Sequence, residues 1–241
     1  MSGATALERI SREVDASVVR IGDEQTPVIV LDYVLGDLEP LKRVASEWAA
    51  FSGEGQAAYP GIRANLPADY TRRVLSRVEP LIREVYAVPA SHRGHCVHQL
   101  FSLVTRAESD LAVLQRVPHY DTRRGFYFAI MHYLNPGPFG GTGFFRHRPT
   151  GYERITDERF AHFVQEAERH MREHGTPPAR YCRGSDAHFE LIHQVDYRPD
   201  RLLIYPGNLL HSGLIEPDRD LSADPARGRL TANLFLDFDA S

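Results

Sequence analysis

The sequence of 241 residues has little cysteine, no excess of positive charge and no long apolar run. Two cysteines, Cys96 and Cys182, cannot form the disulfide framework that small secreted domains need, so we expect a reducing compartment, the cytoplasm. A formal net charge of −4 argues against a protein that binds nucleic acid regardless of sequence, because such proteins are usually basic.

Segments that would direct the chain to or across a membrane are also missing. Residues 1–17 carry charges throughout and lack the apolar core of a signal peptide. The run Phe126–Met131 is far too short to cross a bilayer, which takes about 20 apolar residues. With 42% apolar and 25% charged residues, the composition is that of a globular protein, large enough for one β-rich domain or two small ones.

The N-terminal part of the chain combines one strand with helices. The β-branched stretch Pro27–Leu35 is typical of a strand. Asp37 is a predicted N-cap for a helix. The apolar face of that helix is formed by Leu38, Leu41, Val44, Ala45, Trp48 and Ala49. Residues 67–89 indicate further helix, with Pro80 near the middle as a break or a new start.

From His98 onward the pattern becomes that of strands, interrupted by one helix. Strands are predicted at residues 98–105, 111–117, 125–134, 187–197, 201–207 and 229–238, and a loop at 136–141. Thr156 is a predicted N-cap and Gly175 a stop for a helical insertion at 156–175. This order favours a single α+β domain over 1–241, with a strand and supporting helices in 1–95 and a β-sandwich or barrel in 96–238.

A histidine and a carboxylate stand two residues apart just before the strand at 125–134. Side chains at i and i+2 of a strand share a face, so His119 and Asp121 can bind one metal ion. The pair could equally be accidental, because roughly one His-x-Asp is expected by chance in a chain with 12 histidines. Iron(II) oxygenases need a second histidine, and His211 is the best candidate. Two imidazoles and one carboxylate leave three coordination positions open for chemistry.

The strand at 229–238 has one polar and one apolar face. Its polar residues, Arg229, Thr231 and Asn233, alternate with Leu230, Ala232, Leu234 and Leu236. The polar face lies either in water or inside a barrel, with the apolar face then under the N-terminal helices. Inside a barrel, Arg229 would bind a carboxylate through two parallel hydrogen bonds, and Thr231 would add a hydroxyl.

Several motifs, taken in order, resemble those of the iron(II)/2-oxoglutarate-dependent oxygenases, most closely their prolyl-hydroxylase-like branch. They are His119-x-Asp121, Tyr133-Leu-Asn135, Gly140-Gly141-Thr142, Tyr205-Pro206-Gly207, His211 and Arg229-x-Thr231. The resemblance covers about residues 96–238 and the opening at 27–51. It departs from the family in one respect: Arg229 follows His211 by 18 residues, further than expected, across the polar insert 216–228.

This resemblance implies a double-stranded β-helix, that is, a jelly-roll or cupin-like core with N-terminal helices packed on one sheet. It implies that His119, Asp121 and His211 bind iron and that Arg229 binds the distal carboxylate of 2-oxoglutarate. Residues 140–151 also look like a small bacterial family known mainly as a domain of unknown function. A further similarity is to oxygenases that tailor amino acids for peptide natural products.

The activity implied is that of a dioxygenase with Fe(II), 2-oxoglutarate and O2 as cofactors. It would oxidise an unactivated C–H bond of a small molecule, an amino acid or derivative, by hydroxylation, desaturation or ring formation such as cyclopropanation, in natural-product biosynthesis.

We hypothesise that Arg146 and Tyr152 contact the substrate and that the helix at 157–174 forms a lid. Basic residues flank both motifs, namely Arg123, Arg124, Arg146 and Arg148, and either favour an anionic substrate or are solvated loop charges. A homodimer is expected only from the frequency of such assemblies.

Other interpretations stay open. His188 and Glu190 form a second His-x-carboxylate pair, for which a solvated strand face is the better explanation. The histidine-rich residues 92–98 lack the paired motif of a structural zinc site. Rival functions are a cupin-like metal-binding protein that does not use 2-oxoglutarate, a non-catalytic binding module, and a protein or nucleic-acid hydroxylase. Net negative charge makes nucleic acid the less favoured target.

Overall fold

Two antiparallel sheets face each other in the computed structural model, which describes residues 5–10, 14–53 and 59–240. The strands are β1 Asp15–Ile21, β2 Thr26–Asp32, β3 Gly61–Asn65, β4 His92–Val104, β5 Tyr127–Tyr133, β6 Thr142–His147, β7 Phe189–Val195, β8 Leu202–Pro206, β9 His211–Gly213 and β10 Thr231–Ala240. The helices are α1 Ala6–Ile10, α2 Glu39–Glu47, α3 Ala68–Val85, α4 Asp157–His174 and α5 Pro217–Asp220, with 3-10 turns η1 Glu108–Asp110 and η2 Val113–Gln115.

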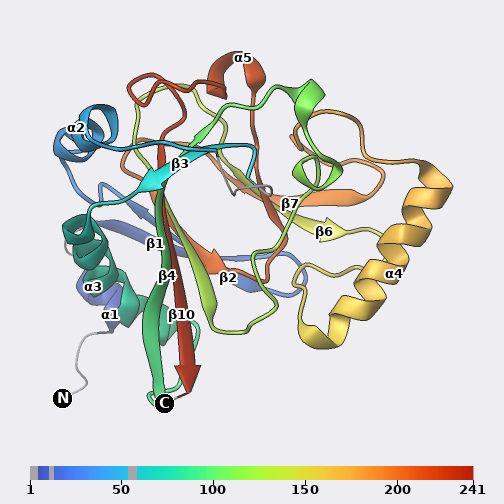
Figure 1. Ribbon diagram of the computed structural model, residues 1–241. Coiled ribbons are helices and arrows are strands. Elements are labelled where there is room, and N and C mark those ends of the chain that lie inside the picture. The colour runs from blue at the N-terminus through green and yellow to red at the C-terminus, as the bar shows by residue number, and fades with distance from the viewer. Residues whose placement is uncertain (1–4, 11–13, 54–58, 241) are drawn as a thin grey trace.

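The strand order is that of the predicted double-stranded β-helix. The large sheet runs β1-β2-β8-β5-β10-β4-β3 and the small sheet β7-β6-β9. From β5 onward the chain passes back and forth between the sheets, with β5, β8 and β10 in the large sheet and β6, β7 and β9 in the small sheet. Figure 1 shows α1, α2 and α3 on the outer side of the large sheet and α4 beside the small sheet. The fold class predicted from the sequence is therefore confirmed.

The apolar face of β10 packs outward, beneath the N-terminal helices. Leu230, Ala232, Leu234 and Leu236 belong to one buried cluster together with residues of α1, α2 and α3. A second cluster, which includes Tyr133, Phe144 and Tyr205, fills part of the space between the sheets. The polar face of β10 therefore points into the barrel, which agrees with the interpretation that places it inside rather than in water. The interior between the sheets thus has an apolar part and a polar part.

Helix α3 runs without a break through Pro80, where the sequence suggested a break or a new start. Its buried face carries Val74, Val78, Leu81 and Ile82. Pro80 and Ser76 are both exposed, so the carbonyl that loses its partner to the proline ring faces water. The helix tolerates the proline because it lies on the solvent side.

Three other local predictions need correction. The predicted strand at 111–117 contains instead the 3-10 turn Val113–Gln115, and no described strand pairs with it; Val113 and Leu114 are 40% and 79% exposed. Leu38 rather than Asp37 is the N-cap of α2, although the Asp37 carboxylate accepts the N–H of Glu39 at 2.9 Å. Trp48, placed on the apolar face of that helix, is 78% exposed.

Strands from the first 95 residues belong to the same sheet as the core. β2 pairs with β8 and β3 pairs with β4, so N-terminal strands extend both edges of the large sheet. The sequence predicted one strand there and missed β1 and β3. It placed no strand at β6 either. No helix in the described ranges is long and apolar enough to span a membrane.

A buried polar network ties α3, β5 and the segment before α2 together. The Asp200 carboxylate accepts hydrogen bonds from His132 Nε2 at 2.9 Å and from the backbone N–H groups of Leu35 and Gly36. Because His132 Nε2 donates, its Nδ1 accepts from the Tyr70 hydroxyl at 3.0 Å. Burial would raise the pKa of Asp200, but these hydrogen bonds outweigh it and lower the pKa.

We therefore predict that Asp200→Asn lowers the free energy of unfolding by about 2 kcal/mol at pH 7. Asparagine tolerates the φ of +61° at this position, so the change isolates the carboxylate. Because the pKa of Asp200 is lowered in the folded state, the difference in stability between wild type and variant should be fully present above the unfolded pKa of about 3.9. It should disappear as the pH falls through the folded pKa. Urea denaturation measures it, with the exposed Asp69→Asn as control; equal stability of the Asp200 variant and wild type at pH 7 would refute the role of this network.

Candidate metal centre

His119 and Asp121 lie in the loop before β5, and backbone hydrogen bonds hold this loop against β9. His119 and His211 exchange both N–H···O bonds, at 2.9 and 2.8 Å, as an isolated antiparallel bridge. The N–H of Asp121 donates to the carbonyl of Gly207 at 2.7 Å, and that of Thr122 to the same oxygen at 3.3 Å. Residues more than 80 positions apart in the chain are thereby fixed side by side.

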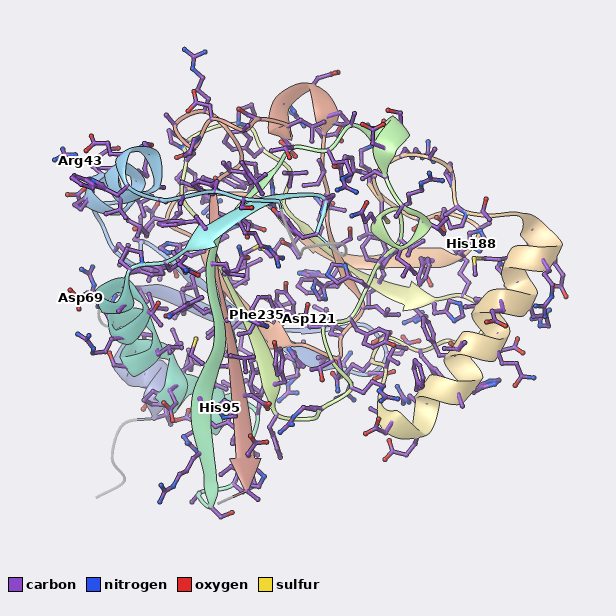
Figure 2. All side chains as sticks on the ribbon, viewed as in Figure 1. Arg43, Asp69, His95, Asp121, His188 and Phe235 are labelled. Atoms are coloured by element: carbon purple, nitrogen blue, oxygen red, sulfur yellow. The ribbon has the colours of Figure 1, made fainter. Side chains whose placement is uncertain are left out.

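The ligand atoms of the three residues converge. One carboxylate oxygen of Asp121 lies 3.9 Å from His119 Nε2 and the other lies 3.8 Å from His211 Nε2. The two imidazole rings are 4.4 Å apart between centroids. Each residue offers an atom within 4.8 Å of those of the other two, so a single ion could be bound by all three. Figure 2 labels Asp121 near the middle of the molecule.

His211 is oriented for binding through Nε2. Its Nδ1 lies 2.8 Å from the carbonyl of Leu209, which can only accept, so Nδ1 carries the proton and Nε2 presents a lone pair toward Asp121. The ring also packs against Tyr205, with centroids 4.7 Å apart. This arrangement of a backbone carbonyl behind an imidazole is typical of metal-binding histidines.

Burial sets the protonation of all three side chains. It lowers the pKa of His211 to about 4 and, together with the neighbouring His211, lowers the pKa of His119 to about 4. His119 nevertheless keeps 55% of its side chain accessible, so protein surrounds the ring but solvent can reach it. Burial also raises the pKa of Asp121 to about 6. At pH 7 both imidazoles are neutral, the form that binds metals.

Two other clusters of metal-binding side chains occur in the described residues, and arginines occupy the carboxylates of both. In the cluster His170, Glu173 and His174, Glu173 accepts two hydrogen bonds from Arg169 at 2.8 and 2.7 Å. In the cluster His95, Asp237 and Asp239, both carboxylates pair with Arg124. Within the described residues, Asp121 has no arginine or lysine within ion-pairing distance. The predicted triad is thus the one cluster of the three whose carboxylate is not already paired with a cation.

Arg229 lies on the inner face of the barrel, just before β10, and is 4% exposed. Its Nε donates to the carbonyl of Gly140 at 2.7 Å and its Nη2 to that of Gly141 at 3.2 Å. The guanidinium also lies over the rings of Tyr133 and Tyr197, at 5.4 and 5.8 Å. In the described part of the chain no carboxylate comes within ion-pairing distance of it, so a buried positive charge lacks an anion.

The long insert between His211 and Arg229 helps to hold Arg229 on the inner face of the barrel. Asp220 in α5 is fully buried and accepts the N–H of Gly140 at 3.1 and 3.2 Å. Gly140 and Gly141 must be glycines, because an added Cβ would lie 1.7 Å from the carbonyl oxygen of Leu214 or 2.1 Å from that of Val195. The insert therefore anchors the loop whose two carbonyls orient Arg229.

Thr231 follows on the same inner face and is 2% exposed. Its hydroxyl accepts a hydrogen bond from the Asn233 amide at 2.9 Å and lies 3.5 Å from the carbonyl oxygen of Ser102. The Asn233 amide donates to the Ser102 hydroxyl as well, at 2.9 Å. Arg229, Thr231 and Asn233 thus line one polar wall, as the alternation in the sequence predicted.

Arg146 and Tyr152, hypothesised to contact substrate, lie elsewhere. The Arg146 guanidinium pairs with Glu153 at 2.6 Å, Asp23 at 2.8 Å and Glu190 at 3.3 Å, which satisfies its charge. Tyr152 packs near α4, beneath the guanidinium of Arg159 at 4.7 Å. Neither has a contact with the triad among the described residues, and the structure offers no support for the hypothesis.

The other basic residues expected at the mouth also have partners. Arg123 pairs with Asp157 at 3.1 Å, Arg124 with Asp237 at 3.1 Å, and Arg148 donates to the carbonyl of Asp186. These arginines do not form a free basic rim, which favours the alternative of ordinary loop charges.

The second His-x-carboxylate pair does not form a metal site in the described structure. His188 is buried, at 6% exposure, with its ring 5.1 Å from that of His170, so it is not on a solvated face as expected. Glu190 pairs with Arg146.

One residue of the polar interior escaped the sequence interpretation. Arg63, on β3, lies over the ring of Tyr59 at 4.0 Å, and its charge acts on both His119 and Asp121. The only available signal was the alternation of Ile62 and Ala64 with Arg63 in a strand of five residues.

Comparisons with known proteins give the following matches. A family model described as "Family of unknown function (DUF6445)" matches residues 12–236. No functionally curated protein matches the sequence. HygX from Streptomyces hygroscopicus, solved with nickel and 2-oxoglutarate bound, is 16% identical over 89% of this chain and 84% of that chain, with a TM-score of 0.48. SnoN, a non-heme alpha ketoglutarate dependent epimerase from nogalamycin biosynthesis, is 14% identical over 88% of this chain and 78% of that chain, at a TM-score of 0.46. An N-substituted L-amino acid dioxygenase from Burkholderia ambifaria AMMD is 11% identical over 93% of this chain and 94% of that chain, at 0.37.

We predict that the protein binds one Fe(II) per chain under anaerobic conditions, and that Asp121→Ala or His211→Ala weakens this binding at least about 100-fold, since even partners outside the ligand set commonly cost 10- to 100-fold. Calorimetric titration measures the affinity. Glu173→Gln, in the cluster on α4, is the matched control and should bind as wild type does. Loss of binding in that control, with retention in the Asp121 variant, would place the metal on α4 instead.

Proposed function

Because the chain belongs to the DUF6445 family, a family of unknown function, we propose an activity from its own geometry: it is an iron(II)- and 2-oxoglutarate-dependent oxygenase acting on a small molecule. The observation that carries the proposal is the convergence of His119, Asp121 and His211, with the carboxylate unpaired by any described cation. On the inner face of the same barrel, Arg229 is buried with no carboxylate of the described residues paired to it.

The donor set fits a ferrous ion. Two neutral imidazoles and one carboxylate on one side of a site form the facial triad of non-heme iron oxygenases. The fixed Nδ1–H of His211 leaves Nε2 as its ligand atom, and each oxygen of Asp121 faces one imidazole. His119, Asp121 and His211 would therefore hold the metal, leaving coordination positions for 2-oxoglutarate and O2.

Arg229 is suited to hold the distal carboxylate of 2-oxoglutarate. Two of its donors are fixed by the carbonyls of Gly140 and Gly141, so the guanidinium is oriented before any ligand arrives. A buried guanidinium without an anion pays a desolvation cost that a carboxylate would offset. We propose Thr231 as a further contact, because its hydroxyl lies on the same wall and retains capacity to accept a hydrogen bond.

When bound, Fe(II) with 2-oxoglutarate and O2 supplies the oxidising power to break an unactivated C–H bond. This chain's residues orient the metal ligands, bind the cosubstrate and hold the substrate in a partly apolar enclosure. We propose a small, amino-acid-derived substrate and a role in natural-product biosynthesis, in line with the resemblance found in the sequence.

The proposal predicts that adding 2-oxoglutarate to the anaerobic Fe(II) protein produces the weak visible charge-transfer band of the chelate. It also predicts slow aerobic formation of succinate that depends on Fe(II), and a mass change in a member of an amino-acid panel. A cupin-like metal protein that does not use 2-oxoglutarate would bind Fe(II) without either the band or succinate, and that result would exclude the proposed function.

Arg229→Gln should weaken 2-oxoglutarate binding at least about tenfold, because a charge-assisted pair to the distal carboxylate is lost. The same band, titrated with 2-oxoglutarate, gives the dissociation constant. Fe(II) affinity should stay as in wild type, which separates loss of the anchor from collapse of the site. An unchanged constant would show that the cosubstrate is held by another residue.

A further inference from the structure

Arg63 occupies a defined place on the inner wall of the barrel. In the large sheet, Thr231 on β10 stands opposite Ser102 on β4, and Ser102 stands opposite Arg63 on β3. Cross-strand partners share a face, so Arg63 lies in the same row as Thr231. Ala64 packs in the cluster beneath the helices, which places the Arg63 side chain on the opposite, inner face.

The positive charge of Arg63 lacks a carboxylate partner among the residues that the structure describes. Its Nε is buried without a hydrogen bond, and no carboxylate of the described residues lies within ion-pairing distance. The guanidinium lies over Tyr59 at 4.0 Å, a contact that orients it but does not satisfy its Nε. Burial lowers the pKa of Arg63, which expresses the same cost of an uncompensated charge. Such a group is stabilised by binding an anion.

Arg63 faces the interior between the sheets, and its charge acts on the proposed metal ligands. Burial dominates the pKa values of His119 and Asp121, and the charge of Arg63 lowers both. Arg124, three residues after Asp121 in the chain, pairs with Asp237, whereas Arg63 has no carboxylate partner among the described residues.

The anion that Arg63 would bind is distinct from the distal carboxylate of 2-oxoglutarate. Arg229, adjacent to Thr231, is placed for that group, and two strand spacings separate β10 from β3, roughly 10 Å. The remaining anionic groups are those of the organic substrate and the carboxylate of 2-oxoglutarate nearest the metal.

Resting on the function proposed above, we propose that Arg63 binds a carboxylate of the organic substrate and that the natural substrate is therefore a carboxylic acid. Holding the substrate by this group, beside the triad, fixes which carbon faces the metal. The Tyr59 ring packs against one face of the guanidinium and keeps it in place. Arg63 is then a specificity-determining residue that the ligand motifs do not reveal.

The test uses the full-length protein loaded with Mn(II) and saturating 2-oxoglutarate, with propionate as the probe and propionamide as its neutral counterpart. Paramagnetic relaxation of the probe's methyl protons reports binding close to the metal. Wild type should bind propionate at least about tenfold more tightly than Arg63→Gln does, and should not bind propionamide measurably. Arg63→Lys, which keeps the charge, should fall between them. Arg43→Gln, on the exposed face of α2 and far from Asp121 in Figure 2, should match wild type.

Each other outcome overturns the inference. If propionate relaxation is equal in wild type and Arg63→Gln, and Arg63→Lys shows that the site folds, Arg63 does not bind the substrate. The same conclusion follows if wild type does not bind propionate. A weaker 2-oxoglutarate constant in Arg63→Gln, measured by the charge-transfer titration with Fe(II), would assign Arg63 to the cosubstrate. If wild type itself fails to bind 2-oxoglutarate, the proposed function falls, and the inference with it.

Discussion

The site depends on one pair of reciprocal backbone hydrogen bonds, between His119 and His211. The loop before β5 has no regular secondary structure and would not by itself hold two ligands in a fixed geometry. An isolated antiparallel bridge joins it to the start of β9, and the N–H of Asp121 donates to the carbonyl of Gly207, so that the loop is held at the edge of the small sheet. The ligand side chains then meet because their backbones are held, which lowers the cost of forming the site.

The rest of the fold supports this junction by separating apolar from polar space. Helices α1 to α3 cover the outer face of the large sheet, so the alternation of β10 can send its leucines outward and its polar residues inward. Between the sheets, Tyr133 and Tyr205 belong to an apolar cluster yet also border the polar residues: Tyr205 contacts His211, and Tyr133 contacts Arg229. The insert with Asp220 closes the same region by fixing the Gly140 loop. The polar part of the interior is thus bordered by defined contacts.

Local patterns in the sequence predicted what depends on local periodicity. The spacing of His119 and Asp121, the alternation of β10 and the bounds of α4 between Thr156 and Gly175 could all be read directly. Contacts between segments that are distant in the sequence could not be predicted in this way. Arg146 was hypothesised to contact substrate because it follows the glycine loop, and its ion pairs with Asp23, Glu153 and Glu190, from three separate segments, are visible only in the structure. Arg63 was missed because the lack of a carboxylate partner among the described residues is likewise visible only in three dimensions. The segment at 111–117 shows that β-branched residues predict a strand only where a neighbour is available to pair with it.

Anaerobic crystals soaked with Fe(II) and 2-oxoglutarate, with diffraction recorded at the iron absorption edge, test the central claim most directly. The account predicts one strong anomalous peak per chain, bonded to His119 Nε2, Asp121 and His211 Nε2, with the distal carboxylate of 2-oxoglutarate on Arg229. A peak at His170 and His174 instead, or no ordered iron between His119 and His211 at full soaking concentration, would contradict it.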